Sequence, residues 1–244
     1  MPLLVILEKI YRSSSLANLL FKTFMCLSVK KSQHPSTSGV LYLENGLVPI
    51  VFCLLSTQLF IWTRKMALNL PESLVNLEAN CGLYAIWMLF QHHGVDVDVN
   101  ALIQATKYDY EEGTYTIALA IALQKFGFKV SFHTDEDPYI EEKERDMYEQ
   151  AKQLKLPVRP ALSYQEIQQA TEQGKFVIVY YDTLDEVGNQ SLVYSVDDNE
   201  ICFFDSFDPM PALLFENQRK AEGICRQAII IDDVEFQMRS ALKN

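Results

Sequence analysis

Cys81 stands in a sequence context suited to nucleophilic chemistry. Asn80 precedes it and Gly82 follows it. The apolar side chains that come next recur at three- and four-residue spacing, which predicts a helix with one buried face formed by Leu83, Ile86, Trp87 and Phe90. A thiol in the first turn of a helix lies near free backbone N–H groups and the positive end of the helix dipole, and both lower its pKa. Those N–H groups can also stabilise an oxyanion. The alternative is a structural cysteine buried at a helix start.

The other cysteines indicate neither a metal site nor a disulfide framework. The five residues form no CxxC pair and no cluster with histidine: Cys26, Cys53, Cys81, Cys202 and Cys225. We therefore expect reduced thiols, no metal and no cofactor. Cys202 and Cys225 fall in or near expected strands, where they are expected to be core thiols.

Charge is unevenly distributed along the 244 residues. The net charge of -11 argues against a nucleic-acid partner. Residues 1–65 carry a net charge of +5, whereas the rest of the chain carries -16. This break predicts an N-terminal extension of residues 1–65 and a globular domain of residues 66–244.

The N-terminal extension allows two interpretations. Residues 47–63 are uncharged and strongly apolar, near the lower limit for a membrane-spanning helix. If they span, the protein is anchored to a membrane. Otherwise residues 1–65 are not part of the functional protein, Met66 is a natural start, and the location is cytoplasmic. The abrupt change of composition at Met66 favours the second interpretation.

Helices are expected first in the globular domain, and strands later. Glycine and capping signals predict helices over residues 81–92, 100–106 and 116–126. Ser163 and Glu166 match a capping box before a further helix. Apolar or alternating runs predict strands over residues 128–132, 176–181, 190–196, 200–205 and 228–231. This order predicts an α+β domain with N-terminal helices packed on an antiparallel sheet. The charged segment 135–155 is expected to be a solvated helix rather than a binding flap.

Several short motifs, in this order, resemble the papain-like cysteine peptidases of the C39 type, the double-glycine leader peptidases. The first is Asn80-Cys81-Gly82 on its helix, and the next is Gly113-Thr114 before a helix that ends in Phe126-Gly127-Phe128. The later ones are the segment 174–179 and the hairpin 192–198 leading into Phe203-Phe204-Asp205. The resemblance covers residues 74–232 and implies a papain-like fold.

The resemblance also implies a mechanism of acyl transfer. In such enzymes a Cys thiolate attacks the peptide carbonyl, a His moves the proton, an Asp or Asn orients the His, and an upstream Gln stabilises the oxyanion. Cys81 matches the nucleophile, and Asp205 matches the orienting residue. These residues are expected to converge with Asn189 at one cleft between the helices and the sheet.

Two family positions are occupied differently here. Asn189 stands where the family has its histidine, and Asn76 is the residue nearest to the oxyanion Gln position. An Asn cannot accept and return a proton near neutral pH, and general base catalysis contributes about 10²–10⁴-fold. His92 and His93 lie about 17 Å from Cys81 on an ideal helix, at its other end. His133 follows a strand that nothing places near the cleft.

Two functions follow from these departures. The first is a catalytically impaired C39-like protein that binds a peptide or protein in the former substrate cleft. The alternative is an active thiol peptidase or acyltransferase, with Cys81 as nucleophile and Asp205 as orienting residue, that uses another base. The two differ in whether Cys81 is more reactive than an ordinary thiol.

Overall fold

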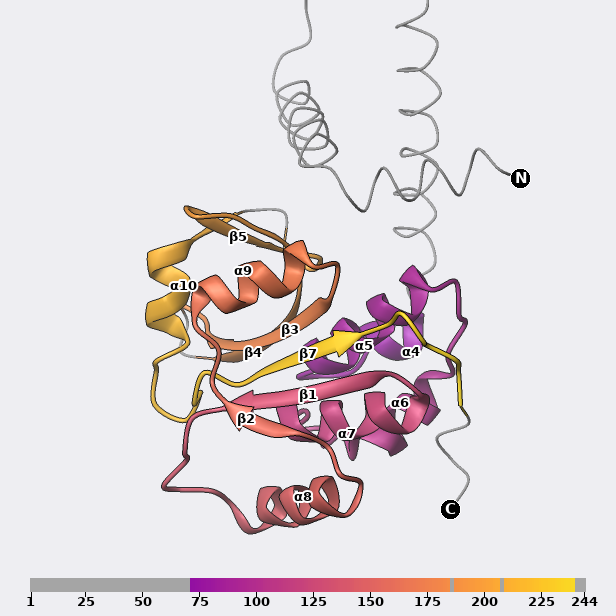
Figure 1. Cartoon of the computed structure of the whole chain (residues 1–244). Helices are drawn as coiled ribbons and strands as arrows, with labels where there is room; N and C mark the ends of the chain where they lie inside the picture. The colour runs from indigo at the N-terminus through magenta and orange to yellow at the C-terminus, as the bar shows by residue number, and fades with distance from the viewer. Residues whose placement is uncertain (1–70, 185–186, 207–208, 240–244) are drawn as a thin grey trace, which may run out of the picture. The chain divides into compact units, whose positions relative to one another are not determined.

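The computed structural model describes residues 71–184, 187–206 and 209–239, all within one compact unit of residues 63–244 (Figure 1). The expected boundary at Met66 and the apolar segment 47–63 lie outside the described residues. No helix within the described ranges has the length and apolar character needed to span a membrane.

The predicted helices form where their sequence signals place them. After the short α4 (Glu72–Val75), α5 runs over Cys81–His92, α6 over Val99–Thr106 and α7 over Thr116–Phe126. The Asp98 carboxylate accepts the N–H of Asn100 at 3.1 Å and caps α6. Gly127 ends α7 with a φ of 110°, a left-handed conformation that favours glycine. The charged segment contains α8 (Glu142–Gln153), and α9 (Tyr164–Glu172) begins with the predicted capping box at Ser163.

The strands form one mixed sheet. In the described residues its order is β2-β1-β7-β3-β4-β5-β6. Its central members are β1 (Lys129–Thr134), β7 (Ala228–Asp232), β3 (Phe176–Asp182), β4 (Gly188–Val196) and β5 (Glu200–Phe203). All their pairs are antiparallel. The short β2 (Val158–Pro160) pairs parallel with β1, which makes the sheet mixed rather than purely antiparallel as predicted.

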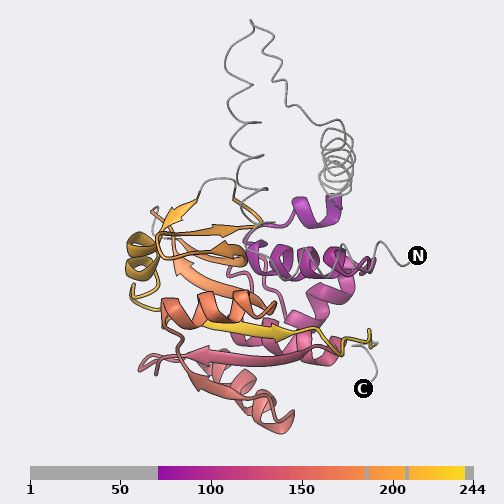
Figure 2. The same ribbon diagram turned by 45° about the horizontal axis from the view of Figure 1, so that its top comes forward.

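Each face of the sheet carries its own apolar core. Helices α5–α8 pack with one set of strand residues, including Ile178 and Leu192. On the other face, α9 and α10 (Ala212–Gln218) pack with the alternate residues, including Val179 and Val193. Figures 1 and 2 show α9 and α10 together near β3–β5, while α5, α6 and α7 cover the opposite side. The α+β prediction is confirmed.

Two elements near the C-terminal end of the domain were not indicated by the sequence. The two-residue β6 (Met210–Pro211) pairs with β5 and leads directly into α10. Asp205 lies in the turn that follows β5, so the hairpin β4–β5 determines its position relative to α5.

Candidate active site around Cys81

Cys81 is the first residue of α5, as the sequence predicts. The Asn80 side chain donates from Nδ2 to the Leu74 carbonyl at 2.8 Å, which ties the helix start to α4. Leu83, Ile86 and Phe90 are fully buried and fix the helix against the sheet and α7. The thiol itself is half-buried and faces β4.

The thiol accepts a hydrogen bond from the free edge of β4. Cys81 Sγ accepts a hydrogen bond from the backbone N–H of Gln190 at 3.4 Å. β5 pairs with β4 only from Leu192 onward, so the segment 188–191 extends beyond its neighbour on that side. The sulfur therefore takes the position that a strand carbonyl would otherwise fill.

The Gln190 side chain links this strand to the loop before α7. Its Nε2 donates to the Thr114 carbonyl at 2.8 Å and to Thr116 Oγ1 at 2.9 Å, and Oε1 accepts from Thr114 Oγ1 at 3.1 Å. Gln190 is 3% exposed. A Cβ placed on Gly82 would lie 2.1 Å from Gln190 Oε1, so only glycine after the cysteine permits this approach.

Asn189 points to the other face of β4 and is held by two hydroxyl groups. Its Nδ2 donates to Tyr181 Oη at 2.8 Å and to Ser191 Oγ at 2.9 Å. Both N–H bonds of the amide are thereby used. Tyr181 and Ser191 are buried, and their hydroxyl groups lie 3.2 Å apart.

Asp205 joins the same network. Ser191 Oγ donates to Asp205 Oδ2 at 2.7 Å. As a residue Asp205 is exposed in its turn, but its carboxylate is directed back at the buried Ser191 hydroxyl. Loss of hydration raises the pKa of this carboxyl, and the hydrogen bonds from Ser191 and Asn189 only partly oppose that rise.

The electrostatics around Cys81 disfavour the thiolate. Burial raises the pKa of the Cys81 thiol above its ordinary value, and the Asp205 charge raises it further. The backbone N–H groups of Gln190 and Gly82 lower that pKa, but burial is the largest cause. Within the described residues, no imidazole stands near the thiol to compensate.

The histidines of the described part lie elsewhere. His133 is 5% exposed on β1, where Nδ1 lies 3.1 Å from the Pro160 carbonyl and burial lowers the pKa. β1 and β4 are three strands apart, about 14 Å. His92 is exposed at the far end of α5, as predicted. His93 is not, because its side chain is only 15% exposed and its Nε2 lies 3.5 Å from Asp233 Oδ2.

The structure therefore brings three of the four predicted residues together. Cys81, Asn189 and Asp205 meet through Gln190 and Ser191. Asn76 is exposed at the C-terminus of α4, with no side-chain contact to this group. Cys202 and Cys225 are half-buried free thiols rather than fully buried core residues.

Gln190, Ser191 and Tyr181 were missed by sequence reasoning. Their roles depend on alternation along β4 and on the β3–β4 register, which pairs Tyr181 with Asn189. The alternation was readable once Asn189 was assigned to a strand, because residues two apart share a face.

A cleft of about 510 Å³ adjoins the group through Gln190, but Cys81, Asn189 and Asp205 are not among its lining residues. Gln190, Thr114, Thr116 and Tyr180 line the end of the cleft nearest to Cys81. The opposite wall comes from the loop after β1, the start of α8 and the loop before β7. Among the described residues, no three acidic, histidine or cysteine side chains converge as a metal site.

A cysteine at a helix start facing a sheet strand, with an aspartate just after the next strand, is the arrangement that the resemblance to the papain-like cysteine peptidases implies. Within that class, the model of the Peptidase C39 family matches residues 73–187, which confirms the predicted resemblance. The match ends two residues before Asn189, so the roles assigned to Asn189 and Asp205 stay predictions.

One solved structure found to be similar is the peptidase domain of Streptococcus ComA, a bifunctional ABC transporter involved in a quorum-sensing pathway. It is 15% identical, with a TM-score of 0.39, over 62% of this chain and 89% of that domain. No curated protein matches the chain.

Proposed function

We propose that this C39-like protein has lost most or all of its peptidase chemistry and binds a peptide or protein in the cleft beside Cys81. The observation that carries the proposal is the hydrogen bonding of the Asn189 side chain. Its amide donates both N–H bonds to Tyr181 and Ser191. At the family's histidine position there is thus a fixed structural donor that cannot shuttle a proton.

The thiol supports the same conclusion. With its pKa raised by burial, Cys81 is protonated at neutral pH and is a weak nucleophile. In the described part of the chain, Asp205 has no imidazole to orient and instead accepts from the Ser191 hydroxyl. The cleft of about 510 Å³, lined by the buried Gln190, provides a shaped surface for a ligand that does not depend on a base.

The test is the pH dependence of Cys81 alkylation in the full-length protein. Iodoacetamide labelling between pH 5 and 10 is quantified at the Cys81 peptide by mass spectrometry, with Cys202 in the same digest reporting any unfolding. We expect the Cys81 rate to rise only above about pH 8.5, the pKa of an ordinary thiol. A thiolate already formed near pH 5 contradicts the proposal and supports the active hydrolase or acyltransferase instead.

Asn189→His sharpens this test. An imidazolium beside the thiol favours the thiolate, so alkylation at pH 7 should become about tenfold faster than in the wild type. Asn189→Leu is the matched control, because it removes the amide and adds no titratable group. If the leucine variant reacts as fast as the histidine variant, the amide itself was suppressing the thiol and the proposed role of the missing base is wrong.

A further inference from the structure

The charged residues that line the cleft beside Cys81 are all acidic. Its acidic lining residues are Glu112, Asp137, Glu141, Glu144 and Glu222. No Lys, Arg or His is among the described residues that line it. Lys143 reaches Glu112 Oε2 at 3.1 Å, but it does so from outside the cleft. The cleft therefore carries an excess of negative charge with little internal compensation.

Among the acidic residues that line the cleft, Glu144 gives the strongest indication that a ligand binds there. It is 6% exposed, and it lines the cleft from the first turn of α8. Its carboxylate has no ion pair within the described residues, and Oε1 receives a single long hydrogen bond, 3.5 Å, from Gln227 Nε2. A buried carboxylate is costly unless it is paired or hydrogen-bonded. Burial, together with the nearby Asp137 charge, raises the pKa of Glu144, as expected for a carboxyl that lacks a cation.

Aromatic rings line the same space. Tyr115, Tyr139 and Tyr180 border the cleft, and Tyr115 Oη donates to Glu141 Oε2 at 2.5 Å. Tyrosine faces attract ammonium and guanidinium groups, which adds to the attraction of the carboxylates. Because no three acids converge closely enough for a metal ion in the described residues, an organic cation on a flexible stem fits the cleft better.

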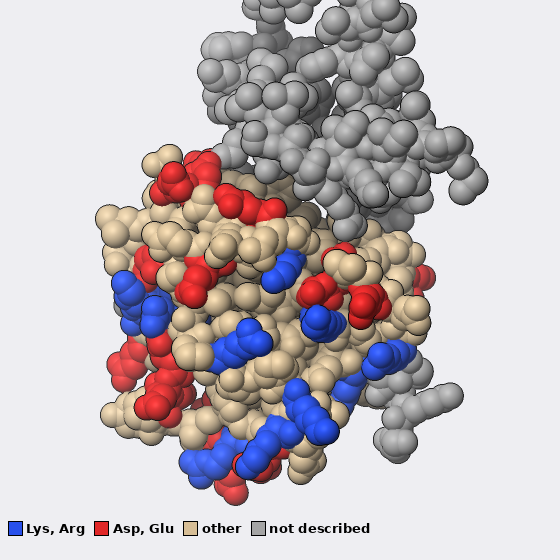
Figure 3. Space-filling model, viewed as in Figure 1, with Lys and Arg blue, Asp and Glu red and all other residues tan. Residues whose placement is uncertain are grey.

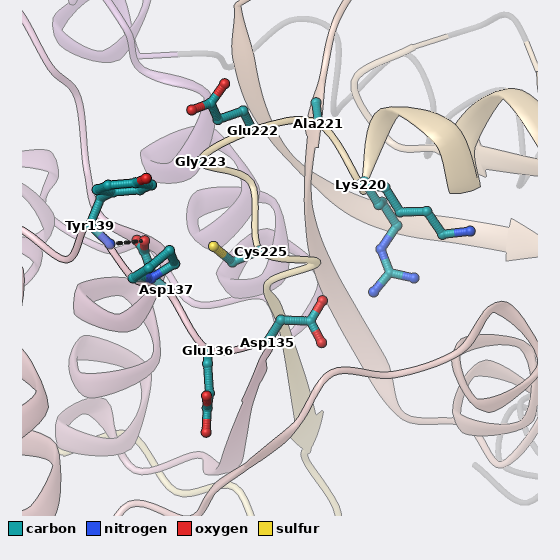
Figure 4. Close-up of a pocket in the computed structure, with 11 residues that line it drawn as sticks. Asp135, Glu136, Asp137, Tyr139, Lys220, Ala221, Glu222, Gly223 and Cys225 are labelled. Carbon is teal, nitrogen blue, oxygen red and sulfur yellow. Dashed lines mark hydrogen bonds between the residues drawn. The ribbon is translucent and has the colours of Figure 1, made fainter.

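A second hollow, lined by both acidic and basic residues, adjoins the cleft. This second space, about 290 Å³, shares Asp137, Tyr139, Glu222 and Gly223 with the cleft. Figure 4 shows Asp135, Glu136 and Asp137 on one side of it, facing the loop that carries Glu222 and Cys225. In Figure 3, a group of acidic side chains at the left edge lies just below a group of basic ones, where Figure 1 has the loop between α10 and β7 near the end of β1. Arg219 and Lys220 also line this second space and Arg226 pairs with Asp135, so the uncompensated negative charge is a property of the cleft itself.

We propose that this cleft selects a lysine or arginine side chain of the bound peptide, with Glu144 as its innermost partner. The inference rests on the proposed binding function and adds the chemical class of the ligand. Gln190 lies between this cation site and Cys81, so the selected side chain belongs to a residue near the one that contacts the thiol.

The experiment measures binding of hexapeptide pools to the full-length protein. The pools are N-acetylated and C-amidated, carry a neutral fluorophore, and differ at one fixed position: Lys, Arg, norleucine or citrulline. Fluorescence anisotropy gives the affinity of each pool. We expect the Lys and Arg pools to bind about tenfold more tightly than their neutral analogues, since charge-assisted hydrogen bonds are the strong ones.

The matched variants are Glu144→Gln and Glu149→Gln. Both lie on α8, but Glu149 is exposed and outside the cleft. The preference for cationic pools should collapse in the first variant and persist in the second. If Glu144→Gln does not fold, Glu222→Gln tests the same prediction at an exposed lining position.

Three results overturn the inference. Equal affinity for charged and neutral pools shows that the cleft binds peptides without selecting charge, and leaves the proposed function standing. A cationic preference unchanged in both cleft variants places the charge recognition elsewhere. No binding by any pool contradicts the proposed peptide-binding function together with the inference.

Discussion

Two parts of the molecule meet at Cys81, and they are built from different contacts. The helix part, α5 with Gly82, is held by apolar burial and by a close backbone approach. The strand part, β4 with Asp205, is held by a polar network through Asn189, Ser191 and Tyr181. The first part places the thiol at a helix start, where the backbone N–H of Gln190 donates to the sulfur. In the second part, Asn189 and Asp205 are both hydrogen-bonded to Ser191.

Under the proposed function, this difference means that a catalytic position takes on a structural role while the hydrogen bonds around it hold the strand in place. The Asn189 side chain belongs to a hydrogen-bonded network. It donates to two hydroxyl groups, and one of these, Ser191, donates in turn to the carboxylate of Asp205. We therefore expect substitutions in the two parts to have separable effects on the free energy of unfolding and on the reactivity of Cys81.

The largest effect is expected from Gly82→Ala. The new Cβ would lie 2.1 Å from Gln190 Oε1 and 2.4 Å from Thr114 Oγ1, so it must displace a buried, hydrogen-bonded side chain. We expect a loss of about 3 kcal/mol in the free energy of unfolding, measured with urea. Gly174→Ala is the control: nothing lies within 4 Å of its Cβ, and its φ of 77° alone should cost about 1 kcal/mol. Equal losses at the two glycines would mean that Gln190 is not tightly held.

Ser191→Ala should break the strand part while sparing the helix part. It removes the donor to Asp205 and an acceptor of Asn189, and should cost about 2 kcal/mol of stability. Ser195→Ala, in the same strand and only half-buried, should stay within about 0.5 kcal/mol. The pH profile of Cys81 alkylation should change little in either variant. A large shift in that profile for Ser191→Ala would show that the two parts are coupled.

Asp205→Asn should give the smallest effect, one that depends on pH. The folded state raises the pKa of Asp205 above its unfolded value of about 3.9. Its contribution to stability is therefore present below about pH 4 and is lost as pH rises through the folded pKa. The variant should gain stability relative to the wild type between pH 4 and pH 7, by less than about 1 kcal/mol because the turn is exposed. Urea unfolding at both pH values measures this; a relative loss at pH 7 would show that the carboxylate is stabilised.

The sequence predicted those elements whose signals are local. The bounds of α5 and α7 and the Ser163 capping box are confirmed because apolar spacing, glycine and capping residues all act within a few positions. β2 and β6 were missed because they are two or three residues long, include proline, and exist only through pairing with a neighbour. The same limit applies to the site. Cys81 could be found from its motif, whereas Gln190, Ser191 and Glu144 depend on register, alternation and long-range packing.

The hydrogen bond between Cys81 and Gln190 also protects an edge of the sheet. β4 extends past its pairing with β5, and an exposed strand edge is a template for pairing with another chain. The first turn of α5 covers this edge, and the sulfur occupies the Gln190 N–H that a foreign strand would need. Cys81 thus has a structural use that is independent of catalysis, because it helps prevent edge-to-edge aggregation.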